Sequence, residues 1–423
     1  MFKLCIFWGA ATACAATGSP FLSADLPVAK LDFYETFDEK SGGLFTSGKW
    51  IKSGVPKYKH QPVMVKQALR APPGFEKDKG LQLTQEMKYY GVSSPLRRPM
   101  APSGGDAVFQ YEVKFDAFTC GGAYLKFLRA SEELDLKQVD DQTPFSVMFG
   151  PDRCGNDDKV HFIMQHQSPK TLEWEEKHFA SPPAVLVDKL SHLYTLAIHG
   201  ADNSFEIYID KRQVASGNLL ADMEPPINPP LEVDDPTDKK PADWVDEETI
   251  PDPEAVKPDD WDETEPMMIE DTTKIMPEGW REDWALIVPD PTAAMPEDWD
   301  EEEDGVWEAP EVPNPDCDSV PGCGPWTPPM KKNPEYKGKW VPPIVPNPAY
   351  IGEWSPRQIP NENYFEEEHP AHLAPIAAVA VEVWTTNPGI HFDNIIVAHN
   401  LDDAWAFSDA SFALKHEAEL EKQ

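Results

Sequence analysis

The feature that most constrains the fold is a run of tryptophan-centred repeats rich in proline. Four Pro-x-x-Trp units lie between Pro241 and Trp299, and between Trp307 and Tyr364 lie four units in which Trp is followed by prolines, an Asn and often a Tyr. The Trp residues are spaced 17, 19 and 19 residues apart in the first set, and 19, 14 and 14 in the second. Of the 45 prolines, 28 fall between Pro225 and Pro360, which excludes packed helices and central strands there.

This segment has two interpretations, a disordered acidic linker or an ordered repeat structure. High charge and proline content usually indicate disorder. Regularly spaced aromatic residues count against it, because disordered segments are poor in aromatics and gain nothing from spacing them. Each unit is too small to bury a core of its own, and repeats of that kind stack on their neighbours. We therefore predict that residues 225–364 form an out-and-back hairpin arm in which the two sets pack Trp on Trp.

The charge of the chain is concentrated in the same region. Between Glu232 and Asp304 there are 28 acidic and five basic residues, so −23 of the chain's net −37 lies there. Nucleic acid is excluded as a partner, because its phosphates would be repelled. Cations and basic proteins are the partners that this charge favours.

The N-terminus resembles a targeting segment. Lys3 is followed by an apolar run from Leu4 to Ala11 and then by small residues up to Gly18. That pattern predicts a secretory signal peptide over residues 1–18, and a buried first strand or helix is the alternative. Further along, the most apolar stretch, Leu373–Trp384, is interrupted by a Pro and a Glu, so the chain as given is not expected to span a membrane.

Four cysteines remain after the predicted signal peptide, Cys120, Cys154, Cys317 and Cys323. An even number fits a chain addressed to an oxidising compartment. Chain order suggests that Cys120 pairs with Cys154 and that Cys317 pairs with Cys323. Free or metal-binding thiols are the alternative, although there is no Cys-x-x-Cys pair and no His at zinc-finger spacing.

The residues on either side of the arm have the pattern of β-strands. Phe109, Tyr111 and Val113 alternate with polar residues, which predicts a half-buried strand. The apolar alternation of 194–198 returns in 205–209 across a short turn, which predicts a hairpin. Many such strands indicate an all-β fold, an antiparallel sandwich, whose first segment we place at residues 19–224.

The strand pattern returns after the arm, in residues 365–423. Two strands cannot form a domain alone, so we expect Val379–Trp384 and Ile390–Val397 to join the first segment's sandwich. The arm is then an insertion. Asp402 and Asp403 can cap one final helix that carries Trp405.

These segments resemble the calnexin and calreticulin family. The two repeat types are seen in Lys257-Pro-Asp-Asp-Trp-Asp-Glu263 and Gly338-Lys-Trp-Val-Pro-Pro-Ile344. The flanks are similar to the family's lectin domain in four places: Cys120-Gly-Gly-Ala-Tyr-Leu-Lys126, Met148-Phe-Gly-Pro-Asp-Arg-Cys-Gly155, His192-Leu-Tyr-Thr-Leu196 and Gly217-Asn-Leu-Leu220. Four repeats of each type resemble calnexins, which normally continue into a membrane helix and a cytosolic tail not found in this sequence.

The resemblance implies a legume-lectin-like sandwich, a jelly roll, in the lumen of the endoplasmic reticulum. It also implies a calcium-dependent chaperone that binds the terminal glucose of monoglucosylated high-mannose glycans on newly made glycoproteins. Residues that match the family's sugar-binding positions are Tyr124, Lys126, Phe145, Met148, Glu176, Glu382 and Trp384. Alternate spacing puts Tyr124 and Lys126 on one face of a strand. Solvated strand surface is the alternative for each, least so for Glu382, which interrupts an apolar run.

Phe145 departs from the family, which has a sugar-contacting Tyr at this position. The ring can still pack, but one hydroxyl contact is lost, at a cost of about 0.5–1.5 kcal/mol. Glycan binding is therefore expected to be weaker by up to about tenfold.

Two further sets of residues follow from the resemblance. Asp78, Asp393 and a backbone oxygen near Thr36 match the family's structural calcium ligands, although calcium needs six to eight oxygens. At the arm's tip, Trp299, Asp300, Asp304 and Glu308 match the family's positions that contact a basic domain of a disulfide-isomerase-type oxidoreductase. A solvated acidic run is the alternative for this second set.

Two other functions compete with the lectin chaperone. Glycoside hydrolases share the sandwich and need two carboxylates about 5–9.5 Å apart. They usually carry acids at alternate strand positions, and neither sandwich segment contains Glu-x-Asp-x-Glu. An acidic calcium-storage protein would carry unbroken acidic tracts, whereas these acids are set at fixed places around Trp residues.

Overall fold

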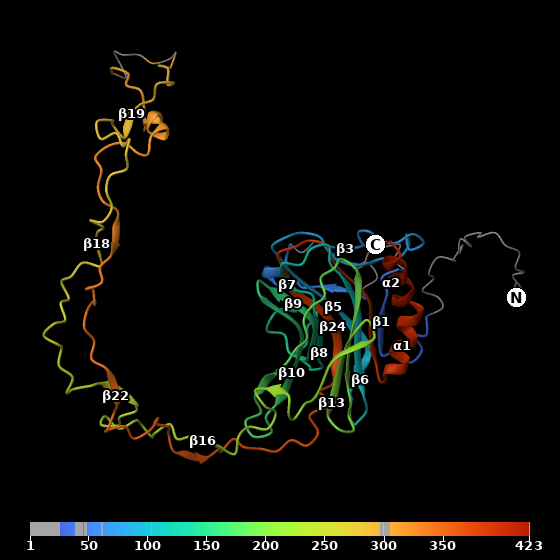
Figure 1. Ribbon diagram of the computed structural model, residues 1–423. Coiled ribbons are helices and arrows are strands. Elements are labelled where there is room, and N and C mark those ends of the chain that lie inside the picture. The colour runs from blue at the N-terminus through green and yellow to red at the C-terminus, as the bar shows by residue number, and fades with distance from the viewer. Residues whose placement is uncertain are drawn as a thin grey trace, which may run out of the picture. The chain divides into compact units, whose positions relative to one another are not determined.

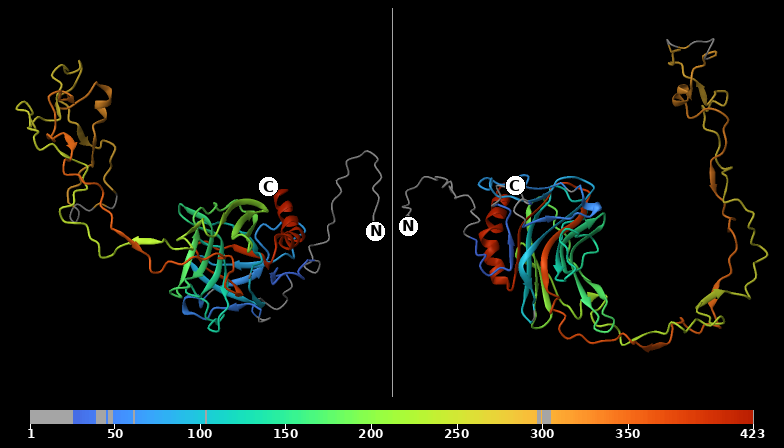
Figure 2. Two further views of the ribbon diagram at one scale, coloured as in Figure 1. Left: turned by 90° about the horizontal axis from the view of Figure 1, so that it is seen from below. Right: turned by 180° about the vertical axis from the view of Figure 1, so that it is seen from behind.

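The computed structural model describes residues 26–38, 45, 49–60, 62–102, 104–296, 299 and 305–422, which form two compact units. One unit contains the described residues up to Val233 and those from Gln358 onward, and the other is Asp234–Arg357. The first unit consists of two stacked sheets with helices on one side (Figure 1), as the views from below and behind also show (Figure 2). The predicted signal peptide lies outside the described residues.

One sheet of the first unit has eight strands in the described part of the chain. Its order is β14-β13-β12-β6-β25-β4-β3, with β1 paired to β25. The strands are β1 (Phe33–Glu35), β3 (Val63–Lys66), β4 (Gly80–Leu83), β6 (Ala107–Lys114), β12 (Ser191–Ile198), β13 (Ser204–Ile209), β14 (Arg212–Asn218) and β25 (Ile390–Ala398).

The other sheet has nine strands among the described residues. Its order is β15-β11-β10-β9-β7-β24-β5-β2, and β8 pairs with both β24 and β9. The strands are β2 (Ile51–Lys52), β5 (Lys88–Met100), β7 (Cys120–Gly122), β8 (Leu125–Arg129), β9 (Phe145–Cys154), β10 (Asp157–Gln167), β11 (Trp174–Phe179), β15 (Met223–Glu224) and β24 (Ile376–Thr385).

Strands that follow the arm in sequence lie inside both sheets. β24 lies between β5 and the pair β7 and β8, while β25 lies between β4 and β6, and all of these pairs are antiparallel. The β12–β13 hairpin also forms, with Tyr194 opposite Ile209 and Ile198 opposite Phe205. The prediction of an antiparallel β-sandwich is confirmed.

The main core lies between the two sheets and is strongly aromatic. Phe109 and Phe127 come from opposite sheets, and their ring centroids are 4.3 Å apart. Tyr111 is fully buried, and its hydroxyl donates to the carbonyl oxygen of Ala123 at 2.7 Å. A buried tyrosine hydroxyl needs such a partner, so this contact fixes the approach of the segment before β8.

Strand β6 differs from the half-exposed strand that its pattern predicts. Phe109, Tyr111 and Val113 enter the core as expected, but Glu112 and Lys114 on the other face are buried too. The reason is that C-terminal helices cover this face, which polar alternation alone does not reveal. The Glu112 carboxylate and the Lys114 ammonium are paired with side chains of the second helix.

The C-terminal segment forms two helices instead of the one expected, α1 (Leu401–Ala410) and α2 (Phe412–Leu420), which meet at Ser411. Asn400 is the N-cap of α1, because its side chain accepts from the Asp403 amide at 2.9 Å. The two predicted capping aspartates instead occupy the first turn, where they complement the helix dipole. Within the described part of the chain, neither of these helices nor any other is long and apolar enough to cross a membrane.

The second unit is a hairpin of short antiparallel strand pairs separated by extended chain. The pairs are β17 (Thr249–Pro251) with β22 (Ile344–Pro346), β18 (Met268–Glu270) with β21 (Met330–Lys332), and β19 (Ile287–Pro289) with β20 (Glu311–Pro313). A fourth pair, β16 (Glu232–Asp234) with β23 (Gln358–Pro360), lies at the unit boundary. The short 3-10 helix η3 (Pro315–Ser319) contains Cys317, which is bonded to Cys323.

The Trp residues of the first repeat set bind the opposite side of this hairpin through their indole N–H groups. The acceptors are backbone carbonyls of glycines, at 2.8–3.0 Å: Trp244 with Gly352, Trp261 with Gly338, Trp280 with Gly324, and Trp299 with Gly305. This contact differs from the expected Trp-on-Trp packing. It explains the even spacing of the repeats, because each Trp must face one glycine.

Candidate carbohydrate-binding site

The predicted sugar-binding residues cluster on the face of the nine-stranded sheet that points away from the core. Lys126 on β8 lies opposite Met148 on β9. Directly opposed side chains in an antiparallel pair share a face. The next residues, Phe127 and Val147, enter the core, so Lys126 and Met148 point outward.

Glu382 is the best-fixed carboxylate on this face. Its Oε2 accepts from Lys126 Nζ at 2.7 Å, and its Oε1 accepts from the Tyr58 hydroxyl at 2.5 Å. Only 5% of Glu382 is exposed. A buried carboxylate is tolerated only when it is paired and hydrogen-bonded, and here both oxygens are. Glu382 therefore has a set orientation.

The ring of Tyr124 lies close enough to Glu382 for the charge of that carboxylate to act on its phenol. A Cβ on Gly122 would lie 2.4 Å from a ring carbon of Tyr124, so only glycine admits this ring position. Burial, then the charges of Glu382, Asp152 and Glu176, raise the pKa of Tyr124, so its phenol stays protonated and can donate.

Two further predicted aromatics flank the cluster. The Lys126 ammonium lies 5.5 Å from the centroid of the Phe145 ring, a cation–π contact. The Trp384 ring lies beside that of Tyr89, with centroids 6.4 Å apart, and Tyr89 is opposite Trp384 on β5. Flat rings beside fixed polar groups can stack on the C–H face of a sugar.

Glu176 lies on the same face but farther from the cluster. It is on β11, opposite Gln165 of β10, and β9 and β10 lie between its strand and that of Lys126. Its side chain is 46% exposed and lies 3.4 Å from His178 Nε2. Its charge still acts on Tyr124 of the cluster, and its exposed carboxylate is open to a ligand on this face.

Tyr58 is a site residue that sequence reasoning missed. It lies in a short 3-10 helix, η2 (Pro56–Tyr58), which has no periodic pattern. The only local signal is Pro56 at the start of the turn, which predicts a turn but no contact.

The Cys120–Cys154 disulfide borders this site, and both predicted disulfide pairings are present. The two cysteines are directly opposite on β7 and β9, and the Cys120 carbonyl accepts from Thr386 after β24. The bridge thus ties β7, which precedes the strand of Lys126 in sequence, to β9, which pairs with that strand.

The two predicted calcium carboxylates, Asp78 just before β4 and Asp393 on β25, lie together around an ammonium group. Lys415 Nζ of α2 lies 2.8 Å from Asp78, 2.8 Å from Asp393 and 2.9 Å from Glu112. All four side chains are at most 5% exposed. The carboxylate oxygens of Asp78, Asp393 and Glu112 therefore bind the ammonium group of Lys415, which is a cation that the chain itself supplies.

The neighbourhood of this cluster contains further acid. The Asp38 side chain lies close enough to Thr36 to hydrogen-bond it, and burial and then the charge of Asp78 raise the pKa of Asp38 to about 7. Calcium takes six to eight oxygens. In the described residues, no group of three or more metal-ligating side chains is arranged for a metal ion. With Lys415 in place, the cluster does not fit calcium.

The predicted partner-binding residues are partly outside the described chain. Asp300 and Asp304 are among the residues that the structure does not describe. The indole of Trp299 donates to Gly305, as in the other repeats, and Glu308 is exposed.

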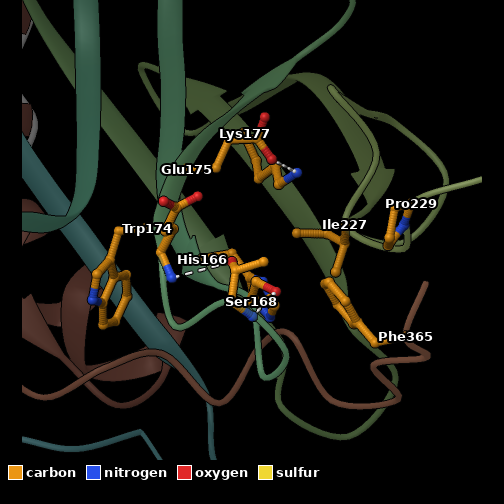
Figure 3. Close-up of a pocket in the computed structure, with 10 residues that line it drawn as sticks. His166, Ser168, Trp174, Glu175, Lys177, Ile227, Pro229 and Phe365 are labelled. Atoms are coloured by element: carbon orange, nitrogen blue, oxygen red, sulfur yellow. Dashed lines mark hydrogen bonds and ion pairs between the residues drawn. The ribbon is translucent and has the colours of Figure 1, made fainter. Parts of the chain in front are cut away.

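A separate pocket of about 290 Å³ lies at the β11 edge of the sheet (Figure 3). His166 stacks on Phe365, with ring centroids 5.9 Å apart, and Lys177 is paired with Glu175 at 2.6 Å. The predicted sugar-binding residues do not line it. The lining residues are His166, Ser168, Thr171, Glu173, Trp174, Glu175, Lys177, Ile227, Pro229 and Phe365.

The fold and the site together define the class, a lectin-type β-sandwich with an inserted hairpin arm. A family model described as the Calreticulin family matches residues 33–397. The chain belongs to the calreticulin family.

Individual relatives agree with this assignment. The calnexin homolog of Aspergillus fumigatus is 53% identical over 348 residues, 82% of this chain and 62% of the relative. Calnexin homolog 1 of Arabidopsis thaliana is 50% identical over 394 residues, 92% of this chain and 72% of the relative. The chain thus spans less than two thirds of the length of the first of these relatives.

A solved structure supports the fold. The globular domain of T. cruzi calreticulin matches with a TM-score of 0.54 at 19% identity, over 92% of this chain and 96% of that chain. At this identity the likeness concerns the fold alone.

Proposed function

We propose that this protein is a lectin chaperone of the endoplasmic reticulum lumen that binds monoglucosylated high-mannose glycans on newly made glycoproteins. The observation that carries the proposal is Glu382, whose carboxylate is held by Lys126 beside the ring of Tyr124. A neutral sugar is recognised by hydrogen bonds to its hydroxyls and by stacking on flat groups. A fixed acceptor, an ammonium donor and neighbouring rings supply these interactions.

Membership in the calreticulin family favours binding over catalysis. A hydrolase of this fold would need a second carboxylate close to the first. Glu176, the other candidate acid, lies across β9 and β10 from the strand of Lys126. We therefore assign Glu382 the role of a hydrogen-bond acceptor.

Calcium is proposed on the family resemblance, with Asp78, Asp393 and the backbone near Thr36 as its ligands. The first two bind the Lys415 ammonium instead. Calcium binding at this place therefore requires a change in the position of Lys415.

The arm is proposed to recruit a disulfide-isomerase-type oxidoreductase through Trp299, Asp300, Asp304 and Glu308. Acidic groups that meet a basic partner give fast, salt-sensitive docking. Immobilised protein should capture such an oxidoreductase at low salt, and Trp299→Ala with Glu308→Gln should abolish capture. Glycan binding by the same variant should be unchanged, and loss of both activities would contradict a separate docking site.

A glycan array tests the main proposal. The protein should bind glycans that carry the terminal glucose and should not bind the same glycans without it. Turnover of any glycan on the array would favour the hydrolase instead. Binding to neither class would reject the lectin function.

A further inference from the structure

The hydroxyl of Tyr58 is one of two donors that hold Glu382. It bonds Oε1 of the carboxylate at 2.5 Å, while Lys126 bonds Oε2 at 2.7 Å. The two donors come from different elements, η2 and β8. A carboxylate bound in this way at both oxygens is fixed in rotation. Each carboxylate has roughly four lone-pair sites, so acceptor capacity remains for a ligand.

Gly91 makes room for the Tyr58 ring. It lies on β5 directly opposite Glu382, so a side chain there would share the face of the carboxylate. An added Cβ would lie 3.1 Å from Tyr58 Cγ and 3.1 Å from Ser53 Cβ. Such contacts are tighter than ordinary van der Waals contact, so a side chain at position 91 would require the Tyr58 ring or Ser53 to shift by a few tenths of an ångström.

The turn that carries Tyr58 is anchored to its surroundings. The Ser53 amide donates to the Gly91 carbonyl at 2.8 Å. Lys57 pairs with Asp141 at 3.1 Å, and its ammonium lies 4.5 Å from the centroid of the Tyr89 ring. Contacts to the sheet and to a separate loop therefore hold the hydroxyl in place.

Tyr58 remains a donor at neutral pH. Burial, and then the hydrogen bond to Glu382, raise the pKa of Tyr58 far above its ordinary value. The phenol has a single proton, and Glu382 accepts it. Tyr58 therefore has no proton to donate to a ligand.

We infer that Tyr58 is a positioning residue for glycan recognition, which acts through Glu382, and that Gly91 is the position that admits it. The inference rests on the proposed function, because it gives Glu382 the task of accepting sugar hydroxyls. It assigns the segment Ser53–Tyr58, which contains none of the residues matched to the family's sugar-binding positions, to the recognition machinery.

The test compares two variants, each of which removes the hydroxyl oxygen of one buried tyrosine. Tyr58→Phe should weaken binding of monoglucosylated glycan by about three- to tenfold in calorimetry, because one of the donors that fix Glu382 is lost. Tyr90→Phe is the matched control. Tyr90 is also fully buried, but its hydroxyl bonds the backbone of Gln85. Its removal should leave glycan affinity unchanged, and an equal loss in both variants would overturn the inference.

Gly91→Ala tests the geometry in a second way. The added methyl group should displace the Tyr58 ring and weaken glycan binding although the hydroxyl is still present. Adding Tyr58→Phe to Gly91→Ala should then cause little further loss, because both changes break one interaction. Fully additive losses would show that the two residues act independently and would contradict the proposal.

The remaining outcomes separate this inference from the proposed function. If wild type binds the glycan and Tyr58→Phe binds it equally well, the positioning role is wrong and the lectin function stands. If wild type binds no glycan, the lectin function fails. Crystal structures of wild type and Tyr58→Phe then decide whether Tyr58 positions Glu382. A carboxylate of Glu382 that turns away in the variant supports positioning, and an unchanged one overturns it.

Discussion

The ammonium group of Lys415 in α2 lies 2.8 Å from the carboxylate of Asp393 in β25, and both side chains are buried. The same ammonium contacts Asp78 and Glu112. Burial lowers the pKa of Lys415, but the charges of Asp393, Asp78 and Glu112 raise it well above its ordinary value overall. The C-terminal helix thus contributes a cation to the acidic cluster at which the resemblance predicts calcium.

Removing this cation should destabilise the protein strongly. Lys415→Met leaves three buried carboxylates without their common partner, and breaking a buried ion pair from one side costs about 3–5 kcal/mol. Urea unfolding should show this loss in the free energy of unfolding. Lys422→Met is the control, because Lys422 is exposed beyond the end of the helix and its ammonium donates to a backbone carbonyl, that of Ala71 at 3.2 Å. Equal stability of Lys415→Met and wild type would contradict the importance of the cluster.

Calcium should stabilise Lys415→Met more than it stabilises wild type. In the variant, Asp78 and Asp393 no longer bind an ammonium, and a ligand that binds only the folded state raises its stability. Melting temperatures with calcium and with a chelator measure the two shifts. The same shift in both proteins would place calcium away from these carboxylates.

Phe145→Tyr should strengthen glycan binding by up to about tenfold, because it restores one hydroxyl contact. The Phe145 ring lies beside Lys126, so the new hydroxyl would enter the same cluster. Calorimetry with one monoglucosylated glycan measures the change. An unchanged or weaker affinity would show that Phe145 does not face the sugar.

His192 should make stability depend on pH near neutrality. Burial lowers its pKa, but hydrogen bonds and charges from Asp210 and Asp188, at 2.7 and 2.8 Å, raise it overall above its ordinary 6.5. A raised folded pKa gives stability that is complete below the unfolded pKa and is lost as pH rises through the folded pKa. The stability difference between wild type and His192→Gln should therefore shrink as pH rises above 6.5. A difference that grows with pH would contradict this.

Local patterns were sufficient to predict the sandwich and the hairpin arm. Alternation in Phe109–Val113 and the even spacing of the Trp residues are properties of short segments, and the structure has both features. The partner of each Trp was missed, because the glycine that accepts from Trp261 is 77 residues away. A signal was present, since each accepting glycine lies two residues before a Trp of the second set, as Gly338 lies before Trp340.

The roles of Lys415 and Tyr58 were also missed because their partners are distant in sequence. A single Lys in a polar helix is usually exposed, and only the packing of α2 on the eight-stranded sheet buries Lys415. Tyr58 lies 324 residues from Glu382 in sequence. Contacts of this kind depend on how the strands assemble, which a single sequence does not state.

Titration with a matched pair of high-mannose glycans, with and without the terminal glucose, tests the central claim most directly. Wild type should bind the glucosylated glycan alone, and Glu382→Ala should bind neither, because the fixed acceptor is gone. Equal binding of both glycans by wild type, or undiminished binding by Glu382→Ala, would contradict the account.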